Sequence, residues 1–156
     1  MDAGLCGALD AHSHRVWMPW LNRRTLSAMT EQSVTPYLCV ADGRAALAWY
    51  VEALGAEMRG DPWVDSDGRI GHAEFAIGES LVFLSESYPD YGVEPPAAGR
   101  GAPMSLVIEV DDCAAALARV RAAGATVTRE PDPDDDRLVG TIIDPSGHRW
   151  MIVQER

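Results

Sequence analysis

The 156-residue sequence is poor in basic residues and cysteine, and it has no long apolar run. Its 13 basic residues are outnumbered by 24 acidic ones, which gives a formal net charge of −11. Because nucleic acids and anionic membranes bind basic surfaces, neither is expected as a partner. No apolar run approaches the roughly 18 residues of a membrane span, and the N-terminus does not have the pattern of a secretory signal.

The three cysteines are an odd number, and their spacing fits neither a metal site nor a redox motif. Free thiols in a cytosolic protein are therefore expected at Cys6, Cys39 and Cys113. The length, the 47% of apolar residues and the 24% of charged residues predict one globular domain of ordinary composition.

What the sequence does contain is one pattern that occurs twice. The first copy covers residues 34–58, and the second covers residues 104–127. When the copies are superposed, Asp42 falls on Asp112 and Gly55 on Gly124. A period this long in only two copies indicates a duplicated half-domain. Residues 1–32 lie outside the repeat, and we expect a poorly ordered extension there, with Met29 as an alternative start.

Each half reads as strand, helix and three further strands, because alternating apolar runs surround one helical pattern between an aspartate and a glycine. A single half cannot bury both faces of so small a sheet, so the halves should pair. A proline-rich linker is expected at 88–103 and an acidic loop at 131–136. The predicted strands are 34–40, 57–64, 70–77 and 80–85 in the first half and 104–110, 125–130, 138–143 and 148–154 in the second.

This arrangement resembles the vicinal oxygen chelate superfamily, which includes glyoxalase I, extradiol dioxygenases, and bleomycin and fosfomycin resistance proteins. The resemblance covers about residues 34–154, and the segments 35–38, 72–80 and 144–150 are similar to the PhnB-like branch. It implies an α+β fold in which two βαβββ modules pair into a cupped, barrel-like mixed sheet with the helices outside. It also implies a homodimer.

In the metal-dependent members of that superfamily, the first and last strands of each module supply the ligands. Carried over by position, these four sites fall on Thr35, Phe83, Ser105 and Met151. None of them is a good ligand for a divalent first-row metal. The resemblance therefore implies a site without a metal, and no cofactor is expected.

Strand alternation points to a different pair of polar residues. A two-residue loop at 78–79 would place Glu74 opposite Phe83, so that His72 and Glu74 face the cup together. Such a pair can be a base with the residue that orients it, two metal ligands, or an ordinary structural hydrogen bond. Glu109 is a further carboxylate on the predicted inner face.

Two classes of function follow from these observations. The first is a metal-free protein that binds an aromatic or basic small molecule, as the bleomycin-resistance branch does. The second is a glyoxalase-like lyase or isomerase, or a dioxygenase, that uses His72 and Glu74 as base or metal ligands. The residues predicted to face the ligand are Thr35, Tyr37, Trp63, His72, Glu74, Phe83, Ser105, Glu109 and Met151.

Overall fold

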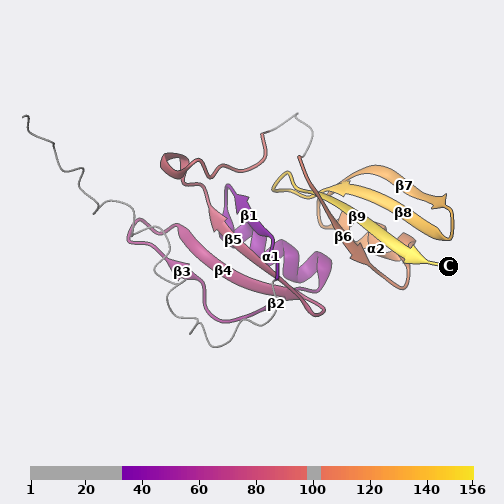
Figure 1. Ribbon diagram of the computed structural model, residues 1–156, viewed down its shortest axis with the longest axis horizontal. Coiled ribbons are helices and arrows are strands. Elements are labelled where there is room, and N and C mark those ends of the chain that lie inside the picture. Colours follow the sequence, from indigo (N-terminus) through magenta and orange to yellow (C-terminus); the bar gives the residue numbers. More distant parts are fainter. Residues whose placement is uncertain (1–32, 98–102) are drawn as a thin grey trace, which may run out of the picture. The chain divides into compact units, whose positions relative to one another are not determined.

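The computed structural model describes residues 33–97 and 103–156 (Figure 1). The expected extension at 1–32 and the alternative start at Met29 lie outside the described residues. Thr35–Arg156 forms one compact unit, in which each copy of the repeat is a sheet with a helix against it. No described helix is long and apolar enough to cross a membrane.

The first module has the predicted order, but its second strand is interrupted. The prediction of one strand over 57–64 is wrong, because only the two ends of this segment pair with β4. Gly60, with φ of 107°, and Pro62, which has no N–H, break the pairing between them. The elements are β1 (Tyr37–Val40), α1 (Gly43–Leu54), β2 (Glu57–Met58), β3 (Trp63–Val64), β4 (Ile70–Ile77), β5 (Ser80–Glu86) and the 3-10 helix η2 (Pro89–Tyr91).

The second module forms a sheet of order β6-β9-β8-β7. The prediction of an acidic loop at 131–136 is wrong, because β7 continues through it and pairs with β8 as far as Asp134. Since β7 is an edge strand, Pro131 and Pro133 are tolerated there, and Arg129 pairs with two of the aspartates. The elements are β6 (Ser105–Glu109), α2 (Cys113–Ala122), β7 (Thr126–Asp134), β8 (Arg137–Ile143) and β9 (Arg149–Glu155).

Both helices begin and end at the predicted residues. Asp42 caps α1, because its side chain accepts a hydrogen bond from the backbone N–H of Ala45 at 3.0 Å, and Asp112 makes the equivalent bond at the start of α2. Gly55 ends the first helix with φ of 68°, and Gly124 follows the second with φ of 97°. Both values lie in the left-handed region that favours glycine.

The core lies between each sheet and its helix and continues from one module to the other. Tyr50 of α1 stacks on Phe75 of β4 and donates a hydrogen bond to Asp144 of the second module at 2.8 Å. Arg119 of α2 donates to the backbone carbonyl of Ala53 at 2.8 Å. In each sheet the first strand runs parallel to the last, and among the described residues no strand of one sheet pairs with the other. The two sheets are therefore mixed and do not close into a continuous barrel.

Candidate functional site

A β-bulge in β4 decides which side chains reach the face of the first sheet that points away from α1. Trp63 pairs with His72, whereas the next residue of β3, Val64, pairs with Ile70. Gly71 is therefore an extra residue of β4 in this pairing. Because of the bulge, Ile70 packs in the core while His72 and Trp63 share the opposite face.

Three rings meet on this face beside a carboxylate. Phe83 pairs with Tyr37 across the parallel ladder and with Glu74 across the hairpin. The ring centroid of Phe83 lies 4.9 Å from that of His72 and 5.7 Å from that of Tyr37. The predicted register of the hairpin is thus confirmed, and Gly78 has the positive φ, 58°, that its predicted two-residue loop needs.

His72 is the middle of a hydrogen-bonded chain. Its Nδ1 lies 2.9 Å from the hydroxyl of Tyr37, and its Nε2 lies 3.3 Å from Oε1 of Glu74. An ionised carboxylate can only accept, so Nε2 carries the proton that is donated to Glu74. In the neutral ring Nδ1 then accepts from the Tyr37 hydroxyl. Both ring nitrogens are engaged by the protein.

Burial keeps His72 and Tyr37 uncharged at neutral pH. His72 is only 6% exposed, and this desolvation lowers its pKa, although Glu74 offsets part of the effect. Burial likewise raises the pKa of Tyr37 to about 12. The imidazole is therefore neutral, and the phenol is a weak acid.

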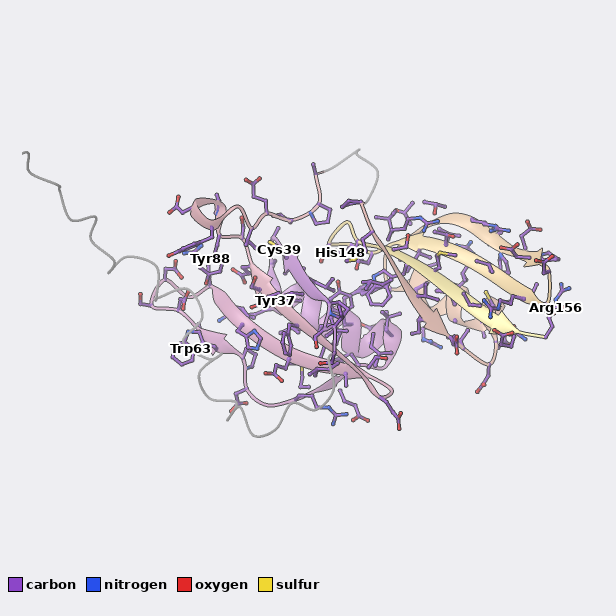
Figure 2. The ribbon with its side chains drawn as sticks, in the orientation of Figure 1. Tyr37, Cys39, Trp63, Tyr88, His148 and Arg156 are labelled. Atoms are coloured by element: carbon purple, nitrogen blue, oxygen red, sulfur yellow. The ribbon has the colours of Figure 1, made fainter. Side chains whose placement is uncertain are left out.

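Trp63 extends this face toward the end of the sheet at which β4 begins (Figure 2). Its indole N–H donates to Oδ1 of Asp65 at 3.0 Å, and the hydroxyl of Tyr88 donates to Oδ2 of the same carboxylate. The guanidinium of Arg69 lies 4.3 Å from the centroid of the Tyr88 ring. Asp65 and Tyr88 were not among the predicted site residues. We call the side chains of Tyr37, Trp63, His72, Glu74 and Phe83 the ring-bearing face.

The second sheet has a separate group of predicted residues. Because Leu106 and Ile108 pack against the core, alternation turns Ser105, Val107 and Glu109 to the other side. Met151 pairs with Val107 and joins them there. Val107 is 60% exposed on this side of the second sheet.

The comparisons with known proteins agree with this architecture. The family model described as Glyoxalase/Bleomycin resistance protein/Dioxygenase superfamily matches residues 30–152. The chain belongs to this superfamily. An uncharacterised protein of Mycobacterium tuberculosis (strain ATCC 25618 / H37Rv) is 31% identical over 137 residues, which cover 83% of this chain and 78% of that protein.

Solved structures of other superfamily members share the fold. A glyoxalase-related enzyme from Fulvimarina pelagi is 22% identical with a TM-score of 0.62, over 80% of this chain and 88% of that one. The fosfomycin resistance protein FosX from Mesorhizobium loti is 16% identical with a TM-score of 0.58, over 82% and 95%. At these identities the likeness shows the fold alone.

The four positions carried over from metal-dependent superfamily members do not fit a divalent ion. Thr35 lies before β1, and Phe83 offers no donor atom. The hydroxyl of Ser105 accepts a hydrogen bond from the guanidinium of Arg149, which puts a positive charge where a cation would bind. Met151 offers only a thioether, which suits soft ions. Among the described residues no cluster of three or more His, Cys, Asp or Glu side chains is placed to hold a metal.

A cavity of about 680 Å³ lies on the other side of the first sheet, between α1 and the segment that carries β2 and β3. Its walls include Val64 and Ile70, the pair behind the bulge, and the helix residues Leu47 and Val51. None of the predicted ligand residues lines it. The bulge therefore separates an apolar hollow on the helix side from the ring-bearing face on the other.

Proposed function

We propose that the protein is a cytosolic, metal-independent small-molecule-binding member of the superfamily, of the bleomycin-resistance and PhnB-like type. The ligand would be an aromatic or basic compound held on the ring-bearing face. The observation that carries this proposal is the Tyr37–His72–Glu74 chain packed against Phe83, which places three rings around one carboxylate. Small-molecule sites are mostly apolar with a few placed polar groups, as here.

The charges of this face favour a basic ligand. His72 and Tyr37 are uncharged at neutral pH for the reasons given above, so Glu74 carries the charge of the chain. Its side chain is 27% exposed and can meet a cation that lies against the rings. The net charge of −11 attracts such a ligand from a distance.

The enzymatic alternative uses the same two residues. Its support is that His72 is neutral at pH 7, the form that a general base needs. Against it, Nδ1 is the nitrogen that would take the substrate's proton, and it already accepts a hydrogen bond from the hydroxyl of Tyr37. Burial raises the pKa of Tyr37 to about 12, so the phenol is also a poor proton donor to a substrate. Base catalysis would first have to break the hydrogen bond between Tyr37 and His72.

One experiment separates the two functions. Binding of proflavine, a flat aromatic cation, is measured by calorimetry before and after treatment of the protein with EDTA. We expect unchanged affinity after EDTA and about tenfold weaker binding by Glu74→Gln, because an ion pair at a partly buried site is lost. Glu52→Gln, on the helix side, is the matched control and should bind like the wild type.

Two outcomes would contradict the binding proposal. One is affinity that EDTA removes and a divalent metal restores. The other is turnover of a superfamily substrate that His72→Gln abolishes, which would establish the enzymatic alternative.

We also propose a homodimer in which a second copy covers the exposed face of the second sheet. Val107 is 60% exposed there and pairs with Met151 of the neighbouring strand, so two apolar side chains lie side by side on this face. Analytical ultracentrifugation tests this proposal. A particle mass near the 16.9 kDa of one chain would contradict it.

A further inference from the structure

The ring-bearing face contains an exposed tryptophan that is nevertheless fixed. Trp63 is 48% exposed, and its indole N–H is bound to Asp65 at 3.0 Å. A large side chain at the surface ordinarily keeps rotamer freedom and loses it when a ligand binds. Here the hydrogen bond to Asp65 restricts the indole before any ligand arrives.

Asp65 is itself held by the turn that it opens. Its backbone N–H donates to the carbonyl of Arg69 at 2.9 Å, and its carbonyl accepts from the N–H of Gly68 at 2.9 Å. These two hydrogen bonds fix the backbone of Asp65. The carboxylate can then accept from Trp63 with one oxygen and from Tyr88 with the other.

The side chains of Trp63, Asp65 and Tyr88 all contact the space above Gly71, the bulge residue. A Cβ at Gly71 would lie 3.0 Å from the hydroxyl of Tyr88, 3.2 Å from Oδ1 of Asp65 and 3.2 Å from Cδ1 of Trp63. Three side chains thus converge over the one residue of β4 that has no side chain. The same bulge turns His72 toward Trp63, so the group borders the Tyr37–His72–Glu74 chain directly.

Tyr88 is fixed from its other side as well. The guanidinium of Arg69 lies 4.3 Å from its ring centroid and donates to the carbonyl of Ser87 at 2.7 Å and to Asp67 at 2.7 Å. This cation–π contact and the bond to Asp65 leave the phenol little freedom. The indole and the phenol therefore form a preformed aromatic wall whose common support is one carboxylate.

We propose that Asp65 is a positioning residue, which holds Trp63 and Tyr88 as this wall and thereby favours flat, ring-bearing ligands over equally basic saturated ones. This inference rests on the proposed ligand site at the ring-bearing face and names the chemical class that the site selects. A flat ligand gains from stacking only if the indole keeps its orientation. Releasing the indole should weaken the binding of such a ligand roughly two- to tenfold, the equivalent of ordering one large side chain.

The test uses Asp65→Asn, which keeps the size of the side chain and the turn but cannot accept from both donors. Asp67→Asn is the matched control for the indole readout, because it removes a carboxylate from the same turn that contacts Arg69 and not Trp63. Two ligands are titrated: proflavine, and cyclohexylamine as the saturated cation. A second readout needs no ligand: the water exchange of the Trp63 indole N–H in the nitrogen-15 spectrum, assigned by its loss in Trp63→Phe.

We expect slow indole exchange in the wild type and in Asp67→Asn, and fast exchange in Asp65→Asn. Proflavine should bind two- to tenfold more weakly to Asp65→Asn, with cyclohexylamine unchanged. In a Trp63→Phe background, Asp65→Asn should weaken proflavine binding less than it does in the wild type, because the indole is already gone and only Tyr88 is left to be released.

Three results would overturn the inference. The first is unchanged indole exchange and unchanged proflavine affinity in Asp65→Asn. The second is an equal loss of affinity in the Trp63→Phe background, which would show that Asp65 acts by another route. The third is a wild type that binds neither compound: this removes the proposed function itself, and slow indole exchange would then assign Asp65 a structural role only.

Discussion

The same aspartate-centred arrangement occurs once in each module, at two different depths. Asp65 and Asp144 each open a turn in which the fourth residue, a glycine, donates back to the aspartate carbonyl at 2.9 Å. Each carboxylate then accepts one indole N–H and one phenol O–H. The donors to Asp65 are Trp63 and Tyr88, and the donors to Asp144 are Trp150 and Tyr50.

Burial gives these two groups different roles. Asp144 is 4% exposed, and the two rings that bind it, Trp150 and Tyr50, belong to the core. Since Tyr50 comes from α1 and Asp144 from the second module, this group joins the two halves of the duplication. Trp63 in the other group is 48% exposed and faces a surface where a ligand can lie. The local chemistry is the same, and the surroundings decide whether it stabilises the fold or shapes a site.

The largest expected effect follows from removing the buried carboxylate. Asp144→Ala leaves the side-chain donors of Tyr50 and Trp150 and the backbone N–H groups of Ser146 and His148 without their acceptor. Hydrogen bonds to a charged group contribute about 1.5–3 kcal/mol each, and unpaired buried donors add a penalty, so we expect a loss of at least about 3 kcal/mol. This corresponds to a fall in Tm of roughly 10 °C for a domain of this size.

Asp65→Ala is the control for that prediction, measured by the same thermal and urea unfolding. Its donors can turn to water, so we expect a loss below about 1 kcal/mol. Equal destabilisation by the two substitutions would show that the exposed group also supports the fold.

The sequence was sufficient for the order of elements because the repeat, the caps and the hairpin loop are local signals. Asp42 and Gly55 are recognisable from their neighbours alone, and alternation from the 78–79 loop correctly put Glu74 opposite Phe83. The two errors, at 57–64 and 131–136, both concern segments that contain proline. Gly60 and Pro62 interrupt the pairing of the first, whereas the second pairs despite its prolines because β7 is an edge strand. Whether a strand lies at an edge depends on its neighbours, which no local pattern contains.

The predicted site was incomplete for a related reason. Four residues of the ring-bearing face follow from strand alternation, whereas Trp63 was chosen only as an aromatic side chain and the Asp65 group was not predicted. Tyr88 comes from the segment predicted as a linker, and it reaches Asp65 across 23 positions. The missed signal was Gly71, a glycine inside a strand, which is typical of a bulge or a close approach of side chains.

The second prediction compares one glycine from each module. A Cβ at Gly140 would lie 2.5 Å and 2.8 Å from the two methyl carbons of Leu117, a residue of α2 that is 1% exposed. Gly140→Ala should therefore cost about 1–3 kcal/mol by overpacking. At Gly71 the nearest atom, the hydroxyl of Tyr88, is 3.0 Å away, so the overlap is smaller and Gly71→Ala should cost less.

Urea unfolding of the two variants measures this difference in stability. The Trp63 indole resonance reports separately whether each substitution disturbs the Asp65 group. That resonance should shift in Gly71→Ala and stay unchanged in Gly140→Ala. The opposite order of stabilities would mean that the Asp65 group is more rigidly packed than the helix interface.

The smallest expected effect is a change of stability with pH. His72 of the first module and Asp144 of the second should lose their contributions to stability in different pH ranges. Burial lowers the pKa of His72, so the folded protein favours the neutral ring more than the unfolded chain does. Its contribution is fully present above the ordinary value of 6.5 and is lost as pH falls below it. Burial acts to raise the pKa of Asp144, but its hydrogen bonds hold it below the ordinary 3.8, so its contribution is lost only as pH falls below about that value.

Urea midpoints at pH 7.5 and pH 5.0 therefore report on His72 while Asp144 stays ionised. The wild type should lose more stability between these two values than His72→Gln, whose amide does not titrate. Tyr37 and Glu74, which are hydrogen-bonded to this ring, both remain in the variant, so the difference between the two losses of stability reports on the imidazole. Equal losses of stability in the wild type and in His72→Gln would mean that His72 titrates in the folded protein as it does in the unfolded chain. The imidazole would then be protonated at mildly acidic pH, and the neutral ring on which the binding proposal depends would be lost there.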